Sequence, residues 1–333
     1  MLRAPNWVGD LVMATPLFEA ALGHAHFARV SIALRAHLAP LLAGGPCAGH
    51  VVELARGRSE TELYRALAPD AIVLFSNSFA AAWRAFRARI PLRAGAALAG
   101  RAVLLTHRVV PPRRHGRRVP IPTAHLLADV AGLVGIQPAS LHPRLYADAA
   151  ARRSVRAELL ALGLAAGARY VLCTPSAAFG AAKLWPARHH ARTLELLHER
   201  FGLAAVVTGA PGEETVVQAV ARACRTPVVD FSRAPRDLER LKALVADAAL
   251  LVTSDSGPRW FAAAFDVPCV TLMGPNFPEL TASALERCEV VRLEGLECAP
   301  CLARVCPLGH HRCMEALEPE RAVAAAARLL GAR

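Results

Sequence analysis

The stretch ALLVTSDSGPRWFAAAF, residues 249–265, decides the predicted fold, because a strand, a turn and a helix follow one another in it. Ala249–Val252 is apolar and suits a buried strand, SDSGP holds turn residues, and residues 258–265 have a helical pattern. Backbone amides near Ser256 and Gly257 would then point at an anion, with the positive end of the helix behind them. Asp255 would fix a sugar hydroxyl or organise the turn.

The same alternation continues through the chain and is typical of β-α-β units. We expect helices near residues 12–22, 59–67, 79–88, 186–200, 213–223 and 236–246. We expect further strands at Arg29–Leu34, His50–Leu54, Ala71–Leu74, Tyr170–Cys173, Ala204–Thr208, Val228–Asp230 and Cys269–Leu272. The sequence therefore predicts an α/β protein of two domains, with two similar parallel sheets in tandem.

The domain boundaries are expected at 1–155 for the first domain and 156–318 for the second. A helix over Ala149–Leu162, closed by Gly163, would cross between them. A last helix in 319–333 would pack back across the cleft. Only Met1, Leu2 and Arg3 precede the motif APNWVGD, so either the first strand is very short or the true start lies upstream.

The net charge of +12 over 333 residues is unevenly distributed. Residues 1–165 carry +11 and residues 166–333 carry +1. A basic first half suits an anionic acceptor, such as a phosphorylated lipid at a membrane surface. The alternative is that the excess of Arg has no binding role and reflects codon drift at solvent-exposed positions. This is plausible because only two of the 39 basic residues are Lys. Nucleic acid is disfavoured, because aromatic residues are sparse and no binding motif is present.

No apolar run is long enough to span a membrane and no signal pattern opens the chain, which predicts a soluble, unexported protein. In such a protein the nine cysteines favour thiols or metal ligands over disulfides. One short segment holds four of them, Cys298, Cys301, Cys306 and Cys313. Their spacing would suit structural zinc, but it does not match a standard finger or ribbon, and we expect free, partly buried thiols.

The motif NWVGD, residues 6–10, places Gly9 in a tight turn and Asp10 at the start of a helix. A carboxylate there would accept a proton from an attacking hydroxyl. The alternative is an N-cap, which Asp serves by accepting a hydrogen bond from a first-turn amide.

Three further loops follow strands in the second half, within PSAAFGAAKLWP (175–186), GAPGEE (209–214) and MGPNFPELT (273–281). Together with the Asp-Ser-Gly turn they outline a site for a nucleotide diphosphate, with Ser176 and Glu213 as further candidates. Lys183 stands out, because Arg has replaced Lys almost everywhere else. Its flexible ammonium suits a departing diphosphate; the alternative is a solvated loop lysine.

These motifs, with NSF (77–79), IPLRAG, MGP and CPLGHHRCM, resemble in order the landmarks of the ADP-heptose:lipopolysaccharide heptosyltransferases of glycosyltransferase family 9, closest to heptosyltransferase II. The resemblance implies a GT-B fold of two Rossmann-like domains, whose parallel sheets face a central cleft. It further implies inverting transfer of a heptose from ADP-heptose to the heptose/Kdo inner core of lipopolysaccharide. It also implies a cytoplasmic enzyme, peripheral at the inner face of the inner membrane, with no cofactor and no catalytic metal.

The resemblance assigns roles to individual residues. Asp10 becomes the general base, and Lys183 with the amides after Asp255 holds the diphosphate. The candidate acceptor-binding residues are Asn6, Trp7 and Gly9 of the first motif, Asn77, and Arg113 and Arg114 of the Pro- and Arg-rich loop at 109–122.

The chain departs from the family pattern around the diphosphate. Ser176, Ala178, Ala181 and Leu184 replace glycine, glutamate, proline and arginine, and Trp260 stands where histidine is usual. Arg259 is the candidate for the missing positive charge. Two alternatives follow: a catalytically weakened or donor-altered paralogue that binds lipopolysaccharide precursors or a partner enzyme, and another nucleotide-sugar enzyme such as an epimerase.

Overall fold

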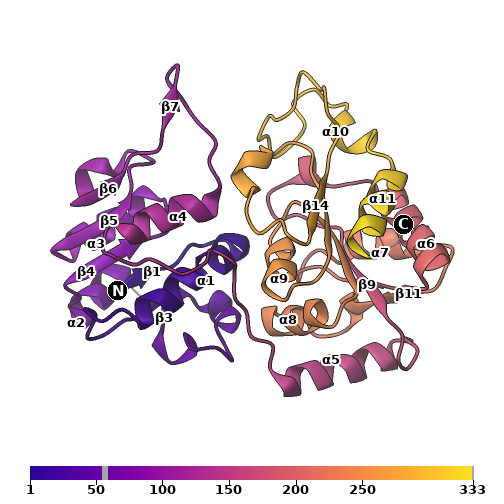
Figure 1. Cartoon of the computed structure of the whole chain (residues 1–333), viewed down its shortest axis with the longest axis horizontal. Coiled ribbons are helices and arrows are strands. Elements are labelled where there is room, and N and C mark those ends of the chain that lie inside the picture. The colour runs from indigo at the N-terminus through magenta and orange to yellow at the C-terminus, as the bar shows by residue number, and fades with distance from the viewer. Residues whose placement is uncertain (55–58, 332–333) are drawn as a thin grey trace. The chain divides into compact units, whose positions relative to one another are not determined.

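The computed structural model describes residues 1–54 and 59–331, drawn in Figure 1. These residues divide into two compact units. Unit 1 comprises residues 1–146 with 279–283, and unit 2 comprises residues 147–278 with 284–331. No helix among the described residues is both long and apolar enough to cross a membrane.

Unit 1 contains a six-stranded parallel sheet in the order β3-β2-β1-β4-β5-β6. Its strands are β1 (Leu2–Arg3), β2 (Ile32–Arg35), β3 (Val51–Leu54), β4 (Ala71–Leu74), β5 (Leu92–Ala96) and β6 (His107–Val109). The central strand β1 has only two residues, and Leu2 pairs with Ile32 on one side and Val73 on the other. This two-residue strand lies at the centre of the sheet.

The helices of unit 1 are α1 (Val8–Leu22), α2 (Glu60–Leu67), α3 (Phe79–Arg87) and α4 (Thr123–Gly132), with 3-10 helices η1 (Ala36–Leu41), η2 (Ala48–His50) and η3 (Arg101–Leu104). Helices α2 and α3 pack on one face of the sheet, where Tyr64 and three alanines of α3 join Ile72 and Leu74 in a core cluster. Helix α4 packs on α1 and on β4 to β6.

Part of the predicted loop at 109–122 forms a hairpin of β7 (Arg113–Arg114) and β8 (Arg117–Arg118). The turn between them has positive φ at His115 and Gly116, which is the twist that two-residue hairpins favour. The hairpin presents four exposed arginines.

Unit 2 repeats the topology, with a parallel sheet in the order β11-β10-β9-β12-β13-β14. Its strands are β9 (Tyr170–Thr174), β10 (Ala204–Val207), β11 (Val228–Asp230), β12 (Leu250–Ser254), β13 (Cys269–Leu272) and β14 (Cys288–Val291). Each sheet reverses its strand order once, between β1 and β4 in unit 1 and between β9 and β12 in unit 2. In such sheets, ligands bind beyond the carboxyl ends of the strands at this reversal.

The helices of unit 2 are α5 (Ala149–Ala161), α6 (Ala187–Phe201), α7 (Glu214–Ala223), α8 (Leu238–Ala246), α9 (Pro258–Ala264), α10 (Arg312–Glu315) and α11 (Pro319–Leu329), with 3-10 helices η4 (Ala181–Lys183) and η5 (Phe231–Arg233); η6 (Pro278–Thr281) begins at the edge of this unit. Helix α5 packs on α8. Helix α11 packs on α6, β13 and β14, and Ala322 and Ala326 join the core of unit 2. The division after Tyr146 places all of α5 in unit 2.

Candidate active site

Asp10 lies in the first turn of α1, directly after the short central strand of unit 1. The helix begins at Val8, and the cap residue is Trp7, whose side chain makes no capping bond. The interpretation of Asp10 as an N-cap is therefore wrong. Burial raises the pKa of Asp10 to about 6. Because no other described residue forms a hydrogen bond or ion pair with this half-buried carboxylate, its oxygens remain available to a ligand.

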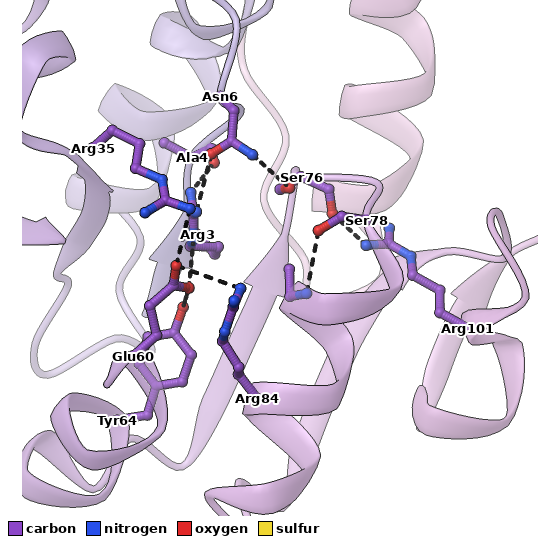
Figure 2. A network of polar contacts seen from close by, with 11 residues as sticks. Arg3, Ala4, Asn6, Arg35, Glu60, Tyr64, Ser76, Ser78, Arg84 and Arg101 are labelled. Carbon is purple, nitrogen blue, oxygen red and sulfur yellow. Dashed lines mark hydrogen bonds and ion pairs between the residues drawn. The ribbon is translucent and has the colours of Figure 1, made fainter. Parts of the chain in front are cut away.

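The loop that leads into α1 is held by a buried arginine in β1. Arg3 donates to the backbone oxygen of Ala4 at 2.6 Å and to Oδ1 of Asn6 at 3.0 Å, and Asn6 donates to Oγ of Ser76 at 3.4 Å (Figure 2). Ser76 lies after β4, so these bonds join the two loops at the reversal of strand order. This support fixes the backbone entry to Asp10.

Glu60, at the start of α2, balances the charge of Arg3 (Figure 2). Its carboxylate is almost fully buried and lies 3.4 Å from Arg3 Nε, 3.4 Å from an Arg35 nitrogen and 3.6 Å from an Arg84 nitrogen. It also accepts a hydrogen bond from the Tyr64 hydroxyl at 3.1 Å. Sequence reasoning missed this cluster; the available signal was an arginine inside a central strand, which requires a buried acid as partner.

The other predicted acceptor residues lie at several places on unit 1. Asn77 accepts from the buried Arg101 at 3.1 Å, and burial lowers the pKa of Arg101 to about 10. Trp7 is exposed and Gly9 lies in the first turn of α1. Arg113 lines a hollow of about 320 Å³, and its neighbour Arg114 lies in the same exposed strand of the hairpin. The other residues that line the hollow are Ala97, Leu98, Ala102, Arg108, Val110, Pro111 and Arg118.

Lys183 and Asp255, two of the predicted donor-site residues, meet at the reversal point of unit 2. The Lys183 ammonium donates to the Asp255 carboxylate at 2.6 Å and to its backbone oxygen at 2.8 Å. Asn276 donates to the same carboxylate oxygen at 2.6 Å, a contact that sequence reasoning missed. Lys183 also lies 5.0 Å from the ring centre of Phe179. Its side chain is only 11% exposed, so the interpretation as a solvated loop lysine is wrong.

Ser176 and Glu213 form a second contact between predicted donor residues. The Ser176 hydroxyl donates to Glu213, whose carboxylate also accepts from the Ala210 amide at 2.7 Å. The Ser256 hydroxyl donates to the backbone oxygen of Ser254 at 3.2 Å, and Gly257 is the cap residue of α9. These bonds link the loops after β9 and β10 and order the turn after β12.

Arg259 and Trp260 are both buried in α9. The Arg259 guanidinium lies 4.4 Å from the ring centre of Trp260. Hydrogen bonding with Cys269, and then the positive charge of Arg259, lower the pKa of the Cys288 thiol. Trp260 therefore fills the interior of unit 2, and Arg259 lies close to a thiol of β14.

The cysteine segment, residues 298–313, supports the Lys183 loop. Ala182 donates its amide to the Arg304 oxygen at 2.9 Å, and the His311 ring lies 2.8 Å from the Ala182 oxygen. The four cysteines Cys298, Cys301, Cys306 and Cys313 are unbridged. Within residues 1–54 and 59–331, no group of three or more His, Cys, Asp or Glu side chains is placed to hold a metal ion.

The chain is similar to known proteins in sequence and in fold. The profile of glycosyltransferase family 9 (heptosyltransferase) matches residues 62–312. Lipooligosaccharide heptosyltransferase 2 of Haemophilus influenzae is 25% identical over 340 aligned residues, which cover 97% of this chain and 96% of the relative.

Two solved structures share the fold. The structure of E. coli ADP-heptose lipopolysaccharide heptosyltransferase II has a TM-score of 0.79 at 23% identity, over 99% of this chain and 97% of that one. A family 9 glycosyltransferase from Veillonella parvula has a TM-score of 0.78 at 20% identity, over 99% and 96% of the two chains. The predicted α/β fold of the GT-B type is confirmed. Since the family profile covers most of its length, the chain belongs to glycosyltransferase family 9, the heptosyltransferases, and is a glycosyltransferase, as its motifs predicted.

Proposed function

We propose that this protein transfers a heptose from ADP-heptose, with inversion, to a heptose or Kdo sugar of the lipopolysaccharide inner core. The observation that carries the proposal is the Asp10 carboxylate, which lies at the strand-order reversal of a family 9 chain, has no partner among the described side chains and has a pKa raised to about 6. A carboxylate with these properties is a suitable base near neutral pH.

In the proposed reaction, Asp10 takes the proton of the acceptor hydroxyl. The hydroxyl oxygen forms a bond to the anomeric carbon from the face opposite ADP. The bond between that carbon and the diphosphate oxygen breaks, and its electron pair leaves with ADP. Lys183, already held near Asp255, would stabilise the charge that develops on the diphosphate. Ser176, Glu213, Arg259 and the turn at Ser256 and Gly257 stay candidates for donor binding.

The acceptor is proposed to bind unit 1, where the basic residues gather. The hollow lined by Arg108, Arg113 and Arg118 also has aliphatic walls, which suits a phosphorylated group attached to an apolar portion. An acceptor that is part of a lipid implies a protein at the cytoplasmic side of a membrane, in peripheral contact with it. Asn6, Trp7, Gly9, Asn77 and Arg114 stay candidates for acceptor binding.

The weakened-paralogue alternative is not favoured. The burial of Trp260 means that this departure from the family pattern fills the interior. Lys183 and Asp255 form an ion pair although neighbouring residues depart from the family pattern.

The experiment is a transfer assay with ADP-heptose and a truncated, heptose-bearing lipopolysaccharide acceptor. We expect turnover by the wild-type protein and by an Asp129→Asn control, and none by Asp10→Asn. Asp129 is an exposed carboxylate on α4 of the same unit. Folded wild-type protein without turnover would refute the proposal; if ADP-heptose then still raised its melting temperature, the binding paralogue would be the better account.

A further inference from the structure

The outer face of α3 is unusual, because large aromatic side chains lie on it and small ones lie beneath it. Phe79, Trp83 and Phe86 are 43–47% exposed, and they recur at the spacing that places residues on one side of a helix. The face that packs on the sheet consists of Ala81, Ala82 and Ala85, all buried. Surface helices of globular proteins usually turn their large apolar residues inward. The structure of unit 1 does not require this aromatic face.

The aromatic rings form one ordered row. The ring centres of Phe79 and Trp83 are 6.3 Å apart and those of Trp83 and Phe86 are 5.8 Å apart, both pairs stacked. The Arg87 guanidinium lies 6.0 Å from the Trp83 ring centre, and Arg93 lies 5.5 Å from that of Phe86. Exposed apolar groups that gather in this way mark surfaces for a partner.

The charge around the row identifies the chemistry of the partner. Between Asp70 and Asp129 the chain has ten arginines and no acidic residue. Arg84, Arg87 and Arg89 lie in α3 or directly after it, and Arg87 and Arg89 are exposed. A second copy of this chain would bring two such basic faces together, which like-charge repulsion opposes. A partner with an anionic surface and an apolar interior matches both the arginines and the exposed aromatic rings.

We propose that the aromatic face of α3, defined by Phe79, Trp83 and Phe86 with Arg87 and Arg89, binds the surface of a bilayer that contains anionic phospholipid. The aromatic rings enter the boundary between headgroups and acyl chains, and the guanidinium groups stay at the level of the phosphates. The inference rests on the proposed function only in so far as that function places the acceptor lipid in a membrane.

The test is co-sedimentation of the full chain with vesicles of phosphatidylglycerol and phosphatidylcholine, and with vesicles of phosphatidylcholine alone. The wild-type protein is expected to bind the anionic vesicles, less so at high salt. The double variant Trp83→Ser, Phe86→Ser should lose at least about tenfold in partitioning, because two large apolar side chains no longer leave water. Arg87→Gln with Arg89→Gln should remove most of the preference for anionic vesicles.

A matched control is Leu160→Ser on α5 of unit 2, where the leucine is 43% exposed, as Trp83 is. It should bind vesicles as the wild type does. Since the aromatic row lies outside the core, the double variant should also keep the melting temperature of the wild type.

Two results would overturn the inference. One is partitioning of the aromatic double variant that equals that of the wild type, including the case in which neither binds. The other is a wild-type protein that sediments as a dimer and an aromatic double variant that sediments as a monomer but binds vesicles as the wild type does. That result would make the aromatic face of α3 a contact between copies of the chain. Failure of the proposed function is a separate result: protein that binds vesicles through α3 but transfers no heptose to a water-soluble acceptor would refute the reaction and leave this inference intact.

Discussion

Replacement of Asp10 by Asn should abolish transfer and at the same time stabilise the protein at neutral pH. Burial raises the pKa of this carboxyl from its usual 3.8 to about 6. The folded protein therefore binds the proton of Asp10 more tightly than the unfolded chain does. A difference of roughly two pH units corresponds to a cost of about 3 kcal/mol for the ionised form, which is a ceiling for a half-buried side chain.

The sign of this effect fixes its pH window. The cost is absent below pH 3.8, develops between pH 3.8 and about 6, and is complete above that value. Asn carries no charge at any pH, so Asp10→Asn should gain stability over the wild type above pH 6, up to about 3 kcal/mol, and gain nothing near pH 3.8 or below. For a unit of this size the gain corresponds to a rise of several degrees in melting temperature.

The assay is thermal or urea unfolding of both proteins at several pH values, together with initial transfer rates. Wild-type kcat/KM should fall about tenfold for each pH unit below 6, as the base becomes protonated. The control Asp129→Asn should change neither property. The reasoning would be refuted by an Asn variant that is less stable than the wild type at pH 7.5, or by one that retains turnover.

Three further substitutions test the supports of the two units. Lys183→Met should raise KM for ADP-heptose and lower kcat, each at least tenfold, because the buried ammonium that contacts the Asp-Ser-Gly turn is lost. Unchanged kinetics would show that Lys183 is not part of the donor site. Glu60→Gln should lower the free energy of unfolding by about 3–5 kcal/mol in urea titrations, since buried positive charge loses its partner, whereas Gln at the exposed Glu62 should have little effect. Gly180→Ala should lower the free energy of unfolding by at least about 1 kcal/mol, because φ is +152° and a Cβ would lie 2.4 Å from the backbone oxygen of Arg304. The control is Gly167→Ala, which is also at positive φ but in open space. Equal losses of stability in the two variants would contradict the role of the close contact at Gly180.

Most strands of unit 2 could be predicted from the sequence, because β9, β10, β12 and β13 are largely apolar runs whose residues are almost all buried. Unit 1 was harder to predict. Strand β5 (Leu92–Ala96) has Arg and Gly in it, and the hairpin of β7 and β8 is composed of arginines around a His-Gly turn, so neither has the apolar pattern of a strand. Strand β14 begins with Cys288 and Glu289 at the edge of its sheet, and its sequence is equally uninformative.

The candidate site, too, could be predicted from the sequence only in part. Asp10, Lys183 and the turn at Asp255 follow strands at the reversal of each sheet, and position along the chain was enough to single them out. The contacts of Arg3, Glu60 and Asn276 depend on residues far apart in sequence, and no local pattern pairs them. The direction in which Trp260 points could not be predicted either, because a helix as short as α9 has too few turns to define a buried face.

The contact between the Lys183 loop and the cysteine segment restricts how donor preference can be engineered. Gly180 packs closely against the backbone of Arg304, and the Ala182 amide donates to the Arg304 oxygen. The ring of His311, from the same segment, contacts the backbone oxygen of Ala182. A loop grafted from another family member would meet a foreign backbone there. Residues 175–186 and 298–313 therefore form one module, and a chimaera that exchanges both together should fold where exchange of either alone fails.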